Sequence, residues 1–185
     1  MTAQALIVVD VQVGFDDPKW GPRNNPQCEQ NIARLLDSWE SSGRPIVIIR
    51  HDSTEPASPL RPDQPGNQLK QFVRDRGAVL IVKSVHSCFH GDPDLHAWLQ
   101  QRQIEDVAIC GITTNHCCET TARVAADLGY RVTFISDATS TFDRMSLSGK
   151  VIAADTVAEM TFANLADEFA EVRDTASVLS TLVAS

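Results

Sequence analysis

The stretch Ala5-Leu-Ile-Val-Val-Asp10 decides the fold, because a short, uninterrupted apolar run ends there at a carboxylate. Such a run is typical of a strand that is buried on both faces of a sheet. Similar runs recur along the chain, and helical patterns stand between them. The predicted strands are Ala5–Val9, Pro45–Arg50, Val79–Val82, Val107–Cys110, Arg131–Ser136 and a weaker Phe169–Val172. The predicted helices are Glu29–Ser42, Asp94–Gln101, Asn115–Leu128, Asp155–Ala166 and Asp174–Leu182.

Strands that alternate with helices predict βαβ units and a parallel sheet. In Glu29–Ser42 the apolar residues fall at the spacing of one helix face, and the Gly43-Arg44-Pro45 sequence ends the pattern. The handedness and topology rules for βαβ connections then favour a doubly wound, mostly parallel α/β sheet with helices on both faces, a Rossmann-like three-layer sandwich.

The composition of the chain is that of an ordinary globular protein, with 43% hydrophobic and 22% charged residues. Its length of 185 residues predicts a single domain, 1–185. The net charge of −8 argues against nucleic-acid binding, which needs basic surface. No apolar run reaches the roughly 20 residues that span a bilayer, and the N-terminus lacks the basic segment of a secretory signal. Five cysteines without a disulfide pattern favour a reduced, cytoplasmic protein.

The functional residues of a doubly wound sheet lie beyond the carboxyl ends of its strands. Four of the predicted strands are followed directly by residues that could carry chemistry, namely Asp10, His51-Asp52, Lys83 and the Gly111–Cys118 turn. Two long irregular segments, Gly14–Gln27 and Asp52–Gln68, leave the same edge and are expected to form pocket walls. We therefore expect a crevice at this edge that binds a small molecule.

Cys117 is placed where a sulfur becomes reactive. It lies at a predicted strand-to-helix turn, in which Thr114 and Asn115 are candidate N-cap residues. The unpaired N–H groups of a first helical turn favour thiolate over thiol, and they stabilise the oxyanion formed on a carbonyl that is attacked. Asp10 is a candidate proton carrier, and Lys83 a candidate cation that stabilises the charged pair.

The chain resembles the isochorismatase-like cysteine hydrolase superfamily over essentially its whole length. The nucleophile signature of that family corresponds to residues 111–130, GITTNHCCETTARVAADLGY. Three further segments fit the family, namely ALIVVDVQ at 5–12, VKSVHSCF at 82–89 and DAT at 137–139. The family fold is the doubly wound sandwich.

The resemblance implies that Asp10, Lys83 and Cys117 form a catalytic triad, with Cys117 as the nucleophile. It also implies a cis peptide bond between Ile112 and Thr113. The backbone amides of Thr113 and Cys117 would then form the oxyanion hole.

The chain departs from the patterns of two groups within the family, and these differences narrow the expected activity. Isochorismatases proper lack the cysteine, so Cys117 favours cleavage of a C–N bond in a small amide, imide or carbamoyl compound. Nicotinamidases of the family bind a metal through Asp-x-His and a further His, whereas this chain has Asp52-Ser-Thr54. We therefore expect no metal and no cofactor, and nicotinamidase activity is disfavoured.

Other residues near the triad are candidates for the substrate pocket. Phe15, Trp20 and Phe89 are possible apolar walls, Gln12 is a possible polar contact, and His116 precedes the nucleophile. A single aromatic side chain is more often part of the core, and His116 could equally be a turn histidine bonded to the backbone. Family members often form dimers or tetramers, so a homo-oligomer is expected, but no stretch of the sequence identifies the interface.

Features of the sequence also raise three other possible functions. A zinc site built from His86-x-Cys88-x-His90 and the His116–Cys118 segment is disfavoured, because ligand pairs are usually two to four residues apart. A dinucleotide site is disfavoured because no G-x-G-x-x-G follows the first strand. The remaining alternative is a non-catalytic scaffold or regulatory protein with the same fold.

Overall fold

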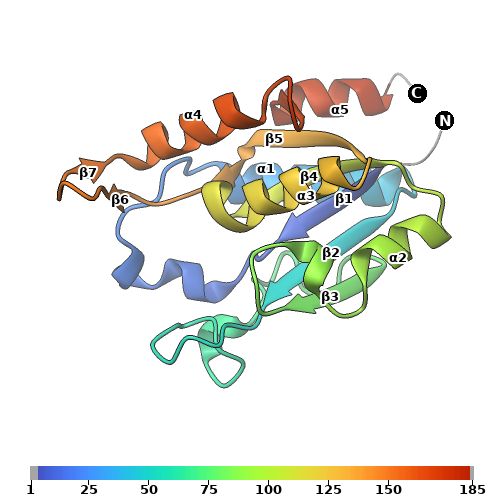
Figure 1. The fold of residues 1–185 in the computed structure, drawn as a ribbon. Coiled ribbons are helices and arrows are strands. Elements are labelled where there is room, and N and C mark those ends of the chain that lie inside the picture. The colour runs from blue at the N-terminus through green and yellow to red at the C-terminus, as the bar shows by residue number, and fades with distance from the viewer. Residues whose placement is uncertain (1–3, 184–185) are drawn as a thin grey trace.

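The computed structural model describes residues 4–183 and contains a doubly wound, six-stranded parallel sheet (Figure 1). The strand order is β3-β2-β1-β4-β5-β8, and every neighbouring pair is parallel. The strands are β1 (Ala5–Val9), β2 (Ile46–His51), β3 (Val79–Lys83), β4 (Asp106–Ile112), β5 (Arg131–Ser140) and β8 (Glu171–Arg173). The predicted fold class is confirmed.

Helices cover both faces of this sheet. They are α1 (Cys28–Ser41), α2 (Leu95–Gln101), α3 (Glu119–Asp127), α4 (Ala154–Leu165) and α5 (Thr175–Val183). Helices α1 and α5 pack on one face, and α2, α3 and α4 pack on the other. The result is the three-layer arrangement visible in Figure 1.

Strand β1 shows why the sheet is buried on both sides. Its five side chains are fully buried. Ile7 and Val9 face the cluster that includes Trp98 of α2, whereas Leu6 and Val8 face the cluster that includes Trp39 of α1. Alternate side chains of a strand point to opposite faces, so an uninterrupted apolar run is what a helix-covered central strand requires.

Several elements differ from the prediction. β5 extends to Ser140, and it is followed by an unpredicted hairpin of β6 (Arg144–Met145) and β7 (Val151–Ile152). The last strand begins at Glu171 rather than Phe169, because the amides of residues 169 and 170 both bond to the Leu165 carbonyl at the end of α4. The predicted Asn115–Leu128 helix is instead a π-helical turn, Thr114–Cys118, followed by α3.

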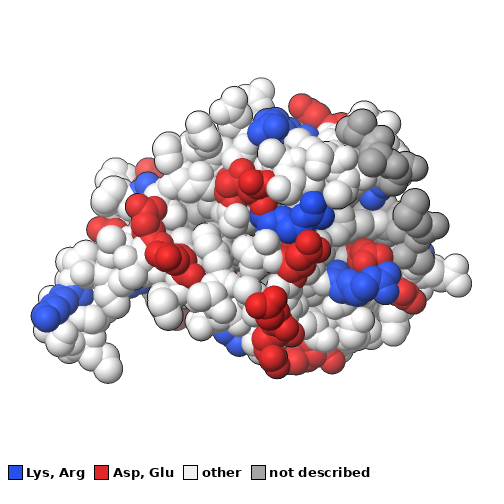
Figure 2. Space-filling view, turned by 90° about the horizontal axis from the view of Figure 1, so that it is seen from above, with Lys and Arg blue, Asp and Glu red and all other residues white. Residues whose placement is uncertain are grey.

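The end of the sheet toward which β1 and β2 point carries the β6–β7 hairpin and the two long irregular segments, 14–27 and 52–68 (Figure 1). Seen from the side of α4 and α5, the surface carries intermingled acidic and basic side chains, and the hairpin extends beyond the body of the protein (Figure 2). Within residues 4–183, no helix has the length and apolar character needed to cross a membrane.

The strand order reverses direction between β1 and β4, which places the expected crevice beyond the carboxyl ends of these two strands. Gly111 makes the close approach of β4 to β1 possible. Its φ is +133°, and a Cβ at this position would overlap the backbone of Val9. The register of β4 with β5 also shifts between Ile109 and Gly111.

We expect Gly111→Ala to destabilise the protein by about 3 kcal/mol or more, because the substitution combines an unfavourable φ with a backbone clash. Gly129→Ala is the matched control, since Gly129 also has a positive φ (+89°) but nothing lies within 4 Å of its Cβ position. The control should cost about 1 kcal/mol. Urea unfolding measures both values, and equal losses would contradict the close-approach argument.

Candidate active site

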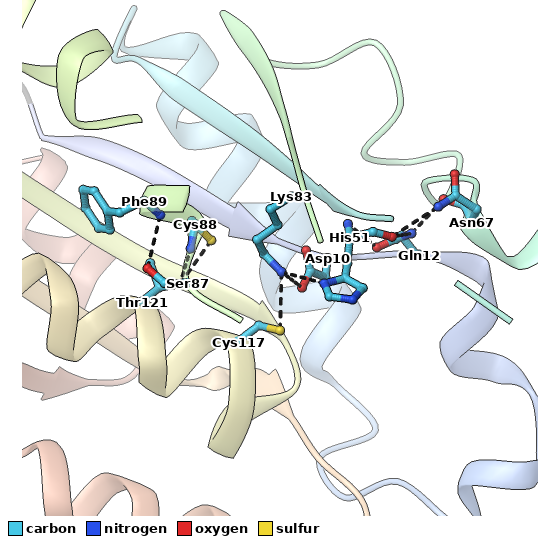
Figure 3. A network of polar contacts seen from close by, with 10 residues as sticks. All are labelled: Asp10, Gln12, His51, Asn67, Lys83, Ser87, Cys88, Phe89, Cys117 and Thr121. Carbon is cyan, nitrogen blue, oxygen red and sulfur yellow. Dashed lines mark hydrogen bonds and ion pairs between the residues drawn. The ribbon is translucent and has the colours of Figure 1, made fainter. Parts of the chain in front are cut away.

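The ammonium of Lys83 lies at the centre of a buried polar cluster beyond the strand ends (Figure 3). Its Nζ donates to Asp10 Oδ2 over 2.7 Å and to Cys117 Sγ over 3.4 Å. It also lies 3.1 Å from His51 Nδ1. The side chains of Asp10 and Lys83 are fully buried. Four elements of the sheet edge therefore converge on one cation.

Asp10 follows β1 with a φ of +51°, in the left-handed region that non-glycine residues seldom adopt. One of its oxygens, Oδ2, is bonded to Lys83, whereas the buried Oδ1 has no hydrogen-bond partner within the described chain. A carboxylate oxygen of Asp10, a ring nitrogen of His51 and Cys117 Sγ lie within 4.8 Å of one another. The free oxygen is thus available for a proton beside the sulfur.

Cys117 lies in the π-helical turn between β4 and α3, where the amides of His116 and Cys118 both donate to the Thr113 carbonyl. The predicted N-cap role of Thr114 and Asn115 is wrong, since the helical turn begins after Thr113 without a side-chain cap.

Thr114 and Asn115 instead fasten the turn to the end of β5. Thr114 Oγ1 donates to Thr139 Oγ1 over 3.0 Å, and Asn115 Oδ1 accepts from Thr141 Oγ1 over 2.5 Å. The cis peptide bond between Ile112 and Thr113, implied by the family resemblance, is present.

The electrostatics at Cys117 differ from the sequence expectation of a thiolate. Burial and the Asp10 carboxylate both raise the pKa of the Cys117 thiol, and Lys83 offsets them only in part. For Lys83, burial alone would lower the pKa, but Asp10 and Cys117 outweigh burial and raise it. Because the pKa of the Cys117 thiol is raised, its protonated form is favoured at neutral pH.

His51 contributes a neutral imidazole with a defined tautomer. Burial, followed by the charge of Lys83, lowers the pKa of His51. An ammonium has only donors, so Nδ1 of His51 accepts from Lys83 and the ring proton lies on Nε2. The sequence placed His51 at the carboxyl end of a predicted strand but gave it no role in the site; in the structure it is the last residue of β2.

We expect nuclear magnetic resonance of the ring nitrogens at pH 7 to show His51 as a neutral imidazole protonated at Nε2. The reason is that the Lys83 ammonium occupies the lone pair of Nδ1. In Lys83→Met this restraint is lost, and Nδ1-protonated ring should become detectable. An imidazolium at pH 7 in the unmodified protein would contradict the assignment.

Gln12 holds the end of β2 and does not line the pocket. It is fully buried, donates to the carbonyls of His51 and Asn67, and accepts from the amide of His51 over 2.8 Å. Asn67 in turn donates to the carbonyls of His51 and Leu60. Gln12 therefore positions His51 and the 52–68 loop.

A cavity of about 340 Å³ opens onto the cluster. This volume suits a small-molecule ligand. Phe15, Trp20 and His116 line it, together with Thr113 and Cys117. The rings of Phe15 and Trp20 are 5.8 Å apart, and both stack on Phe142 to form an aromatic wall. The two segments expected to form pocket walls also contribute Lys19, Ser53, Glu55, Ala57, Ser58 and Leu60. Lining residues that were not expected there are His51, His86 and Arg144.

Phe89 lies away from this cavity. Its ring stacks on Tyr130, with centroids 5.7 Å apart, against the core between the sheet and α2 and α3. The short turn that carries Phe89 is held by the Cys88 amide, which donates to Thr121 Oγ1 of α3. Proximity to Lys83 in the sequence was therefore a poor guide to the direction of Phe89.

The chain does not provide the metal ligands of the nicotinamidase pattern. The carboxylate of Asp52 is already paired with Arg50, at 2.7 Å and 3.0 Å, and it also accepts from Asn67. Thr54 is exposed.

In residues 4–183, the only group of three possible ligands is Asp10, His51 and Cys117, and the Lys83 ammonium already contacts all three. A divalent cation there would face a buried positive charge. Of the alternative zinc ligands, His86 and His116 approach each other, with ring centroids 5.9 Å apart. Cys118, however, is buried in the core, and Cys88 accepts from Thr121.

The fold is that of a doubly wound α/β protein, with a polar crevice at the point where the strand order reverses. The chain belongs to the isochorismatase family, because the Isochorismatase domain model matches residues 4–177. It is 38% identical over 181 residues to the uncharacterized isochorismatase family protein YrdC of Bacillus subtilis, covering 97% of this chain and 96% of YrdC.

Two further comparisons extend this result. A crystal structure of an isochorismatase-family protein from Chromobacterium violaceum superimposes with a TM-score of 0.94 at 38% identity, covering 100% of this chain and 96% of that chain. A streptothricin hydrolase of Streptomyces noursei is 31% identical over 143 residues, which are 76% of this chain and 50% of that protein.

Proposed function

We propose that this protein is a cofactor-free cysteine amidohydrolase that cleaves the C–N bond of a small amide, imide or carbamoyl-type substrate. The observation that carries the proposal is the contact of one buried ammonium, that of Lys83, with both Asp10 and Cys117. The streptothricin hydrolase relative is consistent with hydrolytic chemistry in this family.

In the first half of the reaction, Asp10 takes the thiol proton as Cys117 Sγ attacks the substrate carbonyl. Lys83 stabilises the resulting charge, and the backbone amides of Thr113 and Cys117 are the proposed donors to the oxyanion. Asp10 then delivers the same proton to the departing nitrogen. The C–N bond breaks, an amine or ammonia leaves, and a thioester remains on Cys117.

In the second half, a water molecule loses a proton to Asp10 and attacks the thioester. The C–S bond breaks, the acid product leaves, and the proton returns from Asp10 to the sulfur. Each half therefore moves one proton through Asp10, which fits the raised pKa of the Cys117 thiol and the unpaired Oδ1 of Asp10.

The test is a screen for ammonia release from small primary amides, imides and carbamoyl compounds, followed by acid quenching during turnover of any substrate found. Mass spectrometry of the quenched protein should find the acyl group on the peptide that contains Cys117. If no compound of the panel gives ammonia or an acyl adduct, the result favours the non-catalytic scaffold. An adduct elsewhere would overturn the role of Cys117.

A further inference from the structure

Arg144 is a basic side chain of the cavity without an anionic partner. It begins the β6–β7 hairpin and lines the same cavity as Cys117. Its Nε is buried and makes no hydrogen bond within residues 4–183, and no ion pair of Arg144 is found there. Burial lowers the pKa of Arg144, and no neighbouring carboxylate raises it again.

The charge of Arg144 also acts on His116, another residue that lines the cavity. After burial, Arg144 is the next cause that lowers the pKa of His116, to about 4. His116 is therefore neutral at pH 7 and offers no compensating charge. An unpaired, half-buried guanidinium is unfavourable in a free protein, unless a ligand supplies the anion.

Neither carboxylate that lines the cavity pairs with Arg144, and the cation Lys19 already has partners of its own. Asp10 is bonded to Lys83. Glu55 is exposed, and no ion pair or hydrogen bond links it to Arg144. Lys19 donates to the Ala57 carbonyl and lies over the ring of Trp20, so its ammonium already has partners at the rim.

We propose that Arg144 binds a carboxylate of the substrate, so that the substrates are amides carrying a negative charge. This inference rests on the proposed amide hydrolysis and names its substrate class. A guanidinium pairs with a carboxylate through two parallel N–H···O bonds, which fix orientation as well as charge. The rings of Phe15 and Trp20, which line the cavity and are backed by the buried Phe142, offer an apolar surface for the carbon skeleton of the substrate.

The experiment compares amido acids with neutral molecules of the same shape. Malonamate, succinamate and glutaramate each carry one amide and one carboxylate, and the corresponding diamides lack the charge. The series varies the separation of the amide carbonyl and the carboxylate, so the best acid reports the span between Cys117 and Arg144. For the best acid, kcat/KM measured by ammonia release should exceed that of its diamide at least about tenfold, the usual range of a charged hydrogen bond.

The variants assign the preference to one residue. Arg144→Gln should remove it, mainly through a higher KM for the acid, while Arg144→Lys should retain part of it. Lys19→Gln is the matched comparison, because it removes another cation of the same cavity. Loss of the preference in Lys19→Gln but not in Arg144→Gln would overturn the assignment.

A binding measurement separates this inference from the proposed hydrolysis. The rate at which iodoacetamide alkylates Cys117 is measured with each acid or diamide as protector. Protection by the best acid at one tenth or less of the diamide concentration, lost in Arg144→Gln, supports the carboxylate site even if no ammonia is released. Equal protection by acids and diamides overturns it, and equal ammonia release from both leaves hydrolysis intact but refutes the charge requirement.

Discussion

Replacing Cys117 with alanine is expected to reduce amide hydrolysis by about 10⁴-fold or more, because no other described sulfur reaches the cavity. The remaining cysteines, at positions 28, 88, 110 and 118, are fully buried, and none of them lines the cavity. The thiol also lies at the edge of the core, so its removal should leave the fold intact. Ammonia release and circular dichroism measure the two effects.

Cys118→Ala is the control for this variant, since it removes the adjacent sulfur from a position that packs into the core. We expect it to lower the free energy of unfolding slightly while turnover persists. Full activity in Cys117→Ala, or a comparable loss in both variants, would contradict the assignment of the nucleophile.

Replacing Asp10 with asparagine is expected to lower kcat by about 10²- to 10⁴-fold, the usual contribution of a proton carrier. An amide side chain retains the shape of the carboxylate but accepts no proton from the thiol. The fold should survive, because Lys83 keeps its contacts with His51 and Cys117. Unchanged kcat in Asp10→Asn would exclude Asp10 as the carrier.

The fold could be predicted almost completely from the sequence, because burial on both faces of a sheet forces short apolar runs such as Ala5–Val9. The β6–β7 hairpin gave no such signal. Its strands have two residues each, and Val151 and Ile152 are substantially exposed, so no burial pattern marks them. As a result, Arg144 was not seen as a pocket residue.

The sequence also predicted which side chains would meet, but not their protonation. The order of the strands brings Asp10, Lys83 and Cys117 to one edge, whatever the loops do. The thiolate expectation considered only the amides of a helical turn. It left out burial and the nearby carboxylate, which depend on the packing of segments distant in sequence.

The directions of side chains within loops could not be predicted from the sequence either. Phe15 and Phe89 both follow strand-end residues closely, yet Phe15 lines the cavity and Phe89 packs on Tyr130. Gln12 was expected to face the ligand, but its bonds to His51 and Asn67 occupy its amide. Such directions depend on hydrogen bonds between loops, which the residue types alone do not specify.

The most direct test of the central claim is the pH dependence of alkylation by iodoacetamide, resolved for each cysteine by peptide mass spectrometry. Cys117 is the cysteine in contact with the cavity, and Cys110, which is fully buried, serves as the internal reference. Asp10 raises the pKa of the Cys117 thiol and Lys83 lowers it, so Asp10→Asn removes the charge that raises the thiol pKa and leaves the charge that lowers it.

Cys117 alkylation in Asp10→Asn should therefore have its midpoint roughly 1–3 pH units below that of the unmodified protein, although the variant turns over amides poorly. Cys110 should remain unreactive in both proteins. A midpoint that stays the same or rises in Asp10→Asn, or a Cys117 no more reactive than Cys110, would show that the three side chains do not act as one unit.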